Sequence, residues 1–305
     1  MDDVEYIRKC LENASVNETH SILSQFSKNY YFSPMKATTE FVGVLKNENL
    51  LVFDQKGKQV TSINAVAFCF DENFMLYIMK KDGIMEKYNC RTNKLVSMCM
   101  HYQEMKGIND MIRIGESSFI FVLFRRKVVK TWYEGNLRQW KSKIITESIL
   151  FNAPIGNIAK VHVCNNLLWC LQEKLGLSNY NVETTRFINS LCPFATHMCI
   201  TPSYTGIICK KKVVIMNELF YPIPNAFPTL ENDDKIMGFE IMEQNNSFCV
   251  FVLTDFSLVY GAYNQIQSIN VVDCTDICVV DNKLFLFDGL LLCYELRNNT
   301  LFPIF

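Results

Sequence analysis

The sequence predicts an all-β fold, namely a single WD-repeat-like β-propeller of six or seven four-stranded blades after a short N-terminal helical extension. Three observations favour this fold. The 305 residues include 23 Phe and 13 Tyr, which are enriched in strands. Short apolar runs alternate with turn signals throughout most of the chain. One turn-and-strand pattern also occurs twice, which indicates repetition of a structural unit.

The repeated pattern is "KKDGIMEKYNCRTNKL" at 80–95 and "LFDGLLLCYELRNNTL" at 286–301. In both copies Tyr, Arg, Asn and Leu follow the Asp-Gly at the same distances, and the two Gly residues are 206 positions apart. A propeller blade needs about 40–45 residues, so five blades of about 41 residues account for this offset. We therefore expect the two Asp-Gly turns at equivalent places in blades that are five apart.

The first 34 residues have helical spacing, with Val4, Ile7 and Leu11 on one face, followed by a second apolar group at 22–26. Ser33-Pro34 ends this pattern, because the residue before a proline avoids the α region. The expected organisation is a helical segment at 1–34 and a β-propeller at 35–305.

After Pro34, apolar runs of about five to seven residues are separated by Gly-, Asn- and Asp-rich turns. Such regular spacing is typical of a sandwich, a barrel or a propeller, and the repeat favours the propeller. The expected strands lie at 41–45, 49–54, 65–70, 74–79, 94–100, 118–124, 127–133, 159–164, 166–172, 212–216, 247–253, 256–262, 276–280 and 283–287. The Pro-rich stretch 221–234 is expected to be a long surface loop that is available for contacts.

Composition limits the classes of partner and the compartment. The formal net charge of −1 gives no attraction to nucleic acid, and no apolar run is long enough to span a bilayer. The polar start "MDDVEYIRKC" is not a signal peptide. The 13 Cys are scattered through apolar runs without a C-x-x-C, so we expect reduced, mostly buried thiols in the cytoplasm.

Catalytic signatures are missing from the sequence, so we expect a non-enzyme without a cofactor or a small-molecule substrate. The only spacings typical of a metal site are His197 with Cys199 and Cys274 with Cys278. A structural zinc site needs four ligands, so buried thiols are the favoured interpretation and no metal is expected. A Cys–His nucleophilic pair stays open, because such a pairing is spatial.

A basic hairpin at 125–143 is the candidate contact surface, since aromatic and Arg side chains dominate binding hot spots. Its candidate partner-binding residues are Arg125, Arg126, Lys127, Lys130, Trp132, Arg138, Trp140 and Lys141. It would bind an acidic partner segment or the headgroups of an anionic membrane. The alternative is a solvated rim whose two Trp side chains pack between blades.

The segment 41–141 resembles the N-terminal domain of the vacuolar protein sorting-associated protein 16 family. The resemblance is carried by "LVFDQKGKQVTSI" (51–63), "VAFCFDEN" (66–73), "IMKKDGIMEKY" (78–88) and "IRIGESSFIFVLFRRKVVKTWY" (112–133). Beyond this region the order of strands and turns is similar. The α-solenoid that follows the propeller in that family has no counterpart in these 305 residues.

The resemblance implies a non-catalytic scaffold that acts in intracellular vesicle transport and membrane fusion, as a subunit of a vacuolar or endosomal tethering complex. Its partners would be other protein subunits, with a peripheral contact to vacuole or endosome membranes. The alternative function is a propeller scaffold in another intracellular assembly, such as a ribosome-associated, ubiquitin-linked or coat complex.

Overall fold

The structure is a computed structural model, and part of the chain is described. The described residues are 35–101, 107–147, 149–150, 153–154, 157–173, 176–192, 195–209, 211–230, 235–244, 247–263 and 265–305. The expected helical segment at 1–34 lies outside the described residues. Within the described part, no helix has the length and the apolar character needed to cross a membrane.

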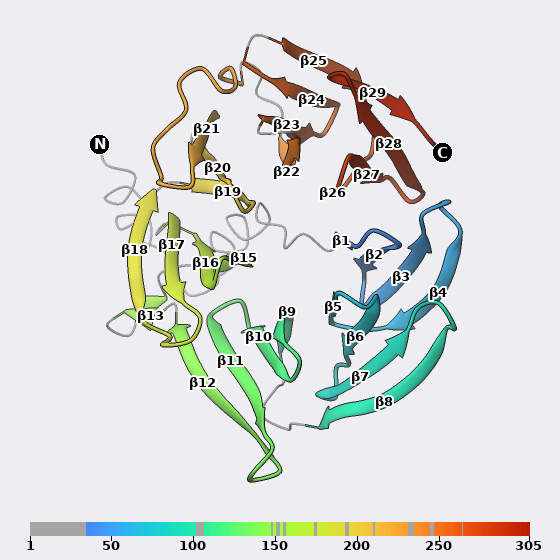
Figure 1. Cartoon of the computed structure of the whole chain (residues 1–305), viewed down its shortest axis with the longest axis vertical. Coiled ribbons are helices and arrows are strands. Elements are labelled where there is room, and N and C mark those ends of the chain that lie inside the picture. Colours follow the sequence, from blue (N-terminus) through green and yellow to red (C-terminus); the bar gives the residue numbers. More distant parts are fainter. Residues whose placement is uncertain are drawn as a thin grey trace, which may run out of the picture. The chain divides into compact units, whose positions relative to one another are not determined.

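Seven small antiparallel sheets are arranged in a ring, which confirms the propeller and settles the blade count at seven (Figure 1). Blade 1 contains β1 (Met35–Ala37), β2 (Phe41–Lys46), β3 (Asn49–Asp54) and β4 (Gln59–Asn64). Blade 2 contains β5 (Ala67–Phe70), β6 (Met75–Met79), β7 (Ile84–Asn89) and β8 (Lys94–His101). Blade 3 contains β9 (Ile108–Gly115), β10 (Ser118–Leu123), β11 (Lys127–Glu134) and β12 (Gln139–Glu147).

The second half of the ring follows the same order after a short extra pair, β13 (Ile149–Leu150) and β14 (Ala153–Pro154). Blade 4 contains β15 (Ile158–Cys164), β16 (Leu167–Gln172), β17 (Gly176–Asn181) and β18 (Phe187–Cys192). Blade 5 contains β19 (Ala195–Ile200), β20 (Tyr204–Cys209) and β21 (Lys212–Asn217). Blade 6 contains β22 (Ile236–Gln244), β23 (Ser247–Thr254), β24 (Ser257–Ala262) and β25 (Gln265–Asn270). Blade 7 contains β26 (Asp276–Val280), β27 (Lys283–Phe287), β28 (Leu291–Arg297) and β29 (Thr300–Pro303).

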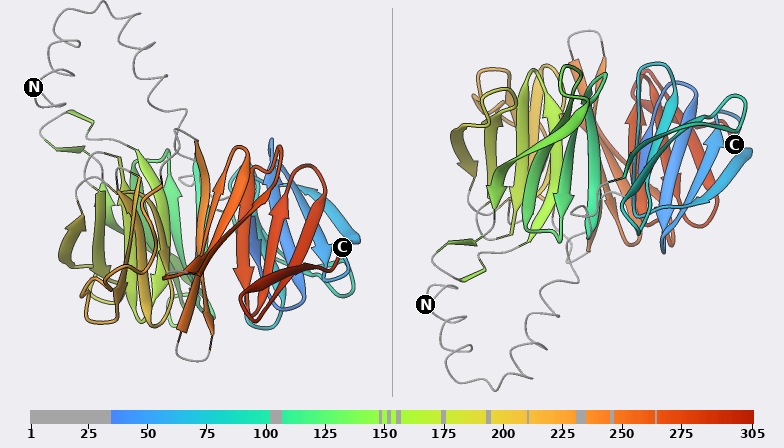
Figure 2. Two further views of the ribbon diagram at one scale, coloured as in Figure 1. Left: turned by 90° about the horizontal axis from the view of Figure 1, so that it is seen from above. Right: turned by 90° about the horizontal axis from the view of Figure 1, so that it is seen from below.

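The blades stand side by side around a central axis, with their turns on two opposite faces (Figure 2). Because the strands of a blade are antiparallel and consecutive, its turns alternate between these faces. Face A carries the turns between the first and second and between the third and fourth strands. Face B carries the turns between the second and third strands and the links to the next blade.

The repeated Asp-Gly units occupy equivalent places. Asp82-Gly83 joins β6 to β7 in blade 2, and Asp288-Gly289 joins β27 to β28 in blade 7. Both are turns between the second and third strands of blades that are five apart, as the 206-residue offset predicted. Gly83 and Gly289 both have positive φ, at 86° and 116°, which glycine adopts without the steric cost of a Cβ.

The core consists of apolar layers between neighbouring blades. In β10, Phe119 and Phe121 pack into a cluster shared with blade 2, whereas Ile120 and Val122 pack into a cluster shared with blade 4. Successive side chains of a strand point to opposite faces of its sheet, so a middle strand of a blade is apolar on both sides. This explains why the sequence shows continuous apolar runs and not a polar–apolar alternation.

The ring closes between blade 7 and blade 1 by side-chain packing, since in the described residues each blade is built from one continuous stretch of chain. Phe53 of β3 and Phe287 of β27 approach to 6.3 Å between ring centroids inside a shared apolar cluster. Lys283 Nζ donates to Gln55 Oε1 at 2.8 Å across the same junction. Phe305 lies against the turn at Gly57, where a Cβ would stand 2.6 Å from the phenyl ring.

Blade 5 has a three-stranded sheet, and the stretch 221–230 runs along its outer edge. Isolated bridges join Met216 to Pro222 and Lys212 to Thr229. Between these bridges Ala226 and Phe227 are buried in the cluster shared by blades 5 and 6. As predicted, most of the described stretch is exposed and irregular, but Ala226 and Phe227 contribute to the core.

Candidate functional site

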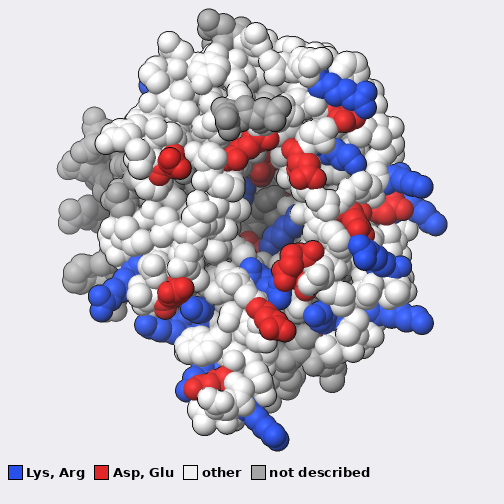
Figure 3. Space-filling model, viewed as in Figure 1, with Lys and Arg blue, Asp and Glu red and all other residues white. Residues whose placement is uncertain are grey.

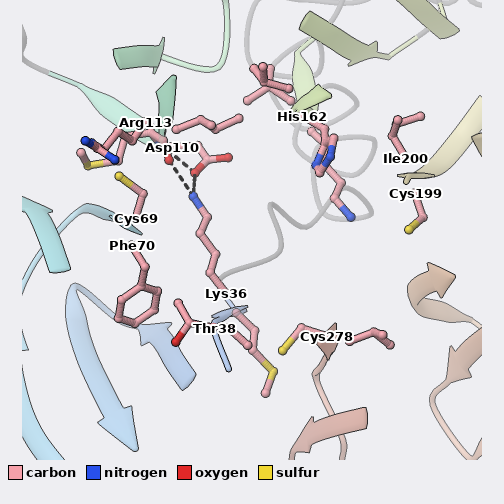
Figure 4. A pocket seen from close by; sticks show the side chains of 18 of the residues that line it. Lys36, Thr38, Cys69, Phe70, Asp110, Arg113, His162, Cys199, Ile200 and Cys278 are labelled. Carbon is pink, nitrogen blue, oxygen red and sulfur yellow. Dashed lines mark hydrogen bonds and ion pairs between the residues drawn. The ribbon is translucent and has the colours of Figure 1, made fainter. Parts of the chain in front are cut away.

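The first strands of the blades surround a central channel of about 420 Å³. Its lining comes from β1, β5, β9, β15, β19, β22 and β26, and Figure 4 shows part of it. Figure 3 shows a hollow at the same place in the face A view, with Lys and Arg side chains inside it and acidic side chains around it. Because charged and polar side chains from several blades line it, the channel is a candidate site.

Two lysines in the channel make equivalent bonds. Lys36 of blade 1 donates to the Phe68 carbonyl of blade 2 at 3.0 Å and to Asp110 Oδ1 of blade 3 at 2.5 Å. Lys160 of blade 4 donates to the Met198 carbonyl of blade 5 at 3.2 Å and to Glu240 Oε1 of blade 6 at 3.3 Å. Each lysine therefore links three consecutive blades, and its charge is neutralised inside the channel.

Arg113 of β9 forms a third ion pair in the channel wall. Its Nη1 lies 2.5 Å from Glu72 Oε2 and 4.0 Å from Asp71 Oδ2, both in the first turn of blade 2. The guanidinium also stacks over the ring of Tyr77 at 5.6 Å. The Lys and Arg side chains of the channel are thus occupied by protein groups.

The remaining titratable groups of the channel are neutral near pH 7. Burial, reinforced by the charge of Lys160, lowers the pKa of His162 in the channel wall to about 4, and it lowers the pKa of the nearby His197 in β19 to the same value. Burial raises the pKa of Cys69 to about 12, and burial together with the neighbouring Glu240 raises the pKa of Cys199 well above its usual value. A thiol must be deprotonated to act as a nucleophile, so these cysteines are not activated.

The two pairs with metal-like spacing, His197 with Cys199 and Cys274 with Cys278, do not belong to a metal site in the described part of the chain. Among the described residues, no group of three or more His, Cys, Asp or Glu side chains is arranged to hold a metal ion. Cys199 instead donates to Glu240 Oε2 at 3.3 Å and accepts from the Ile241 amide at 3.2 Å. Cys274 and Cys278 are buried within blade 7 and its interfaces.

The basic hairpin 125–143 lies in blade 3, and its residues divide between the two faces. Arg125 and Arg126 stand in the β10–β11 turn on face B, and Lys127 begins β11 there. Arg138 stands in the β11–β12 turn on face A, with Lys141 close to it in β12. Since β11 spans eight residues, roughly 27 Å separate the two ends. The prediction from the sequence grouped these residues into one cluster, whereas the structure places them in two.

The aromatic side chains of the hairpin lie on opposite sides of the sheet. Trp140 packs on Phe119 in the cluster between blades 2 and 3, with ring centroids 6.2 Å apart. Trp132 faces blade 4 together with Lys130, whose Nζ donates to the Val182 carbonyl at 3.0 Å. Lys141 forms an ion pair with Glu134 of the same hairpin. Trp140 and Lys130 therefore hold blades together, which leaves the two turns as the accessible parts.

Exposed apolar side chains in the turns were not singled out from the sequence. These side chains are more than half exposed, although loops usually present polar side chains. Leu137 and Leu219 lie on face A. The residues on face B are Phe124, Phe256, Val272 and Leu290. The signal was available in the sequence for all of these residues except Phe124, because each of the others interrupts or borders a Gly-, Asn- or Asp-containing turn.

No family model and no curated protein matches this chain. Solved propellers are similar in structure. BBS1N in complex with ARL6DN is 10% identical with a TM-score of 0.63, over 88% of this chain and 92% of that chain. The Cps50 (Swd1) β-propeller domain of Myceliophteria thermophila is 9% identical with a TM-score of 0.63, over 88% and 97%. BamB of Moraxella catarrhalis is 11% identical with a TM-score of 0.52, over 84% and 81%. At these identities the similarity shows a shared β-propeller fold, and it does not single out the protein 16 family.

Proposed function

We propose that this chain is a non-catalytic scaffold that holds protein partners on the turns of its two faces. One contrast carries the proposal. The ionisable groups of the channel are paired or neutral, whereas large apolar side chains stand exposed on the faces. Exposed apolar groups in otherwise polar turns are typical of interaction sites, because their burial by a partner is favourable.

The finer proposal is the propeller part of a vacuolar or endosomal tethering subunit, acting in vesicle transport and membrane fusion from the cytoplasmic side. Its support is the motif resemblance over 41–141 together with the propeller fold. The solved propeller BBS1N was crystallised in complex with ARL6DN, so a propeller of this layout is compatible with holding a protein partner.

Affinity purification of the tagged full chain from its own cells tests both levels. A stoichiometric set of vacuolar tethering subunits would support the finer proposal. A different stoichiometric complex would support the scaffold and refute the tethering assignment. Recovery of the chain alone, with catalytic activity as a monomer, would refute the scaffold itself.

The basic hairpin remains a proposed contact, now as two separate surfaces. Arg126→Glu changes face B and Arg138→Glu changes face A, and both side chains are exposed. Because these residues lie at opposite ends of β11, we expect a given partner to depend on one of them and not on both. Lys56→Glu, at an exposed turn of blade 1, is the matched control for charge reversal.

The same variants test contact with an anionic membrane. Flotation with vesicles that contain phosphatidylserine should fall for the variant whose face meets the lipid, since juxtamembrane basic residues are attracted to that surface. Flotation that is unchanged in both variants would remove the membrane from the list of partners.

A further inference from the structure

A groove of about 330 Å³ lies between blades 4 and 5 and opens on face A. Trp169 of β16 lies in the blade 4 wall at 2% exposure, and its ring meets Phe220 of blade 5 edge-on at 5.4 Å. The side-chain amide of Asn165 donates to the Pro202 carbonyl at 3.1 Å and joins the two walls. Further apolar lining comes from Leu167, Ile200, Tyr204 and Leu219. The groove is therefore preformed and mostly apolar, as binding clefts are.

The turn that forms the outer wall has a fixed conformation. Asn217 Oδ1 accepts from the amides of Leu219 and Tyr221 at 3.0 Å each. The Asn217 carbonyl accepts from the Phe220 amide at 2.9 Å, and Phe220 has a φ of 63°, which a bulky side chain rarely adopts. As a result, Leu219 is held 66% exposed at the groove, and Tyr221 at the end of the same turn is 67% exposed. A partner does not have to order this turn in order to bind, which lowers the entropic cost.

The charge at the groove is acidic. Glu218 is exposed and is the one charged residue among the described residues that line it. Glu243 stands behind the blade 5 wall, where its Oε1 accepts from the Ser203 amide at 2.8 Å. In Figure 3 the charged side chains visible over β19–β24 are mainly acidic, whereas Lys and Arg gather over the lower and right parts of the face.

We propose that this groove binds a segment of a partner protein that inserts an apolar or aromatic side chain between Trp169 and Leu219 and places a Lys or Arg beside Glu218. The proposal rests on the proposed function, because it identifies one contact of the scaffold. The apolar walls would hold the inserted side chain of the partner. The Glu218 carboxylate would select a basic residue next to it, since an acidic residue there would be repelled by the like charge. Aromatic anchors in desolvated pockets carry most of the affinity of such contacts.

The test uses short random peptides displayed on phage and selected on the purified full chain. Selected peptides should share an apolar or aromatic residue next to Lys or Arg. Their affinity should fall by at least about tenfold in Leu219→Asp and in Glu218→Lys, as expected for loss of a central contact. Leu137→Asp is the matched control, because Leu137 is 54% exposed at the equivalent turn of blade 3.

Three results would overturn the groove: selected peptides without basic residues, peptides that bind both groove variants as tightly as the wild type, or a self-association that Leu219→Asp abolishes. The last would identify a second copy of the chain as the occupant. Failure of the proposed function is distinct, since it requires a wild-type chain that recovers no stoichiometric complex. A complex recovered equally by Leu219→Asp, without groove-dependent peptides, refutes the groove alone.

Discussion

Replacing Lys36 by Met should weaken the ring more than any single surface change. The ammonium donates to Asp110 Oδ1 at 2.5 Å, to the Met111 carbonyl at 2.8 Å and to the Phe68 carbonyl at 3.0 Å. The Lys36 and Asp110 side chains are 26% and 13% exposed, so water replaces little of this pairing. Met preserves the apolar stem and removes the three bonds.

The loss of unfolding free energy depends on the Asp110 charge that remains after Lys36 is replaced. Removing one partner of a buried ion pair costs about 3–5 kcal/mol, because the other charge is left uncompensated. We expect about 3 kcal/mol for Lys36→Met, since the Met111 amide at 2.8 Å still donates to Asp110. Lys36→Met with Asp110→Asn should cost about 1 kcal/mol, because a neutral pair leaves no buried charge. The coupling between the two sites is then about 2 kcal/mol or more.

Urea unfolding, followed by far-ultraviolet circular dichroism and Trp fluorescence, measures these free energies provided that the two transitions coincide. Lys160→Met is the internal comparison, since Lys160 makes the equivalent bonds in blades 4–6. If Lys36→Met costs less than about 1 kcal/mol and the two changes are additive, the pair is screened by water and does not hold the blades together.

Four further predictions concern the histidines, Asp276, a glycine and the thiols. In the folded chain the pKa values of His162 and His197 are lowered to about 4, whereas a histidine of the unfolded chain has a pKa of about 6.5. Between these two pH values the unfolded chain binds more protons than the folded chain, so stability falls as the pH drops from about 6.5 to about 4. His162→Gln should flatten this fall in urea unfolding at a series of pH values, and an unchanged slope would contradict the neutral, buried histidine. Asp276→Asn should steepen the fall, because burial raises the pKa of Asp276 to about 6 and its protonation stabilises the folded chain in the same range. Gly57→Ala should lower the free energy of unfolding by about 1–2 kcal/mol, since the φ of Gly57 is 72° and a Cβ would meet Phe305. Gly135→Ala is the control, because a Cβ at Gly135 has nothing within 4 Å. Equal free energies of unfolding for the two variants would rule out the contact with Phe305. Thiol labelling of the native protein should modify few of the 13 Cys, because eight of the eleven described cysteines are buried. The denatured protein should expose nearly all of its thiols without reductant. Extensive labelling of the native protein, or disulfides in it, would contradict this prediction.

The fold was predictable because its two signals are local. Turn residues mark the ends of strands, and the repeated Asp-Gly unit measures the length of a blade. The number of blades was not predictable to better than six or seven, because the copies between blades 2 and 7 have diverged in sequence while keeping their geometry. In the stretch 221–230 the surface position was predictable, but its two core residues were not. Its prolines argue against a ladder strand, yet Ala226 and Phe227 fill a core position without regular pairing.

The candidate sites were predictable only in part, because a face of a propeller is assembled from turns that are distant in sequence. Proximity along the chain placed Arg126 and Arg138 together, whereas the direction of β11 separates them. The groove between blades 4 and 5 combines Trp169 with Phe220 and Leu219, about 50 residues further along the chain, and no spacing rule connects them. The three-blade bonds of Lys36 and Lys160 likewise depend on the ring and not on any motif.

The junction between blades 7 and 1 has a consequence for how binding is transmitted. Every other pair of neighbouring blades is joined by the chain, whereas Phe53 and Phe287 meet across this one through side chains. Opening at this junction would widen the channel and separate β1 from β26, which are in contact and both line it. A partner that touches both blades is bound only by the closed ring and therefore stabilises it in proportion to the logarithm of its concentration. By reciprocity, a change that tightens the junction would raise the affinity for such a partner.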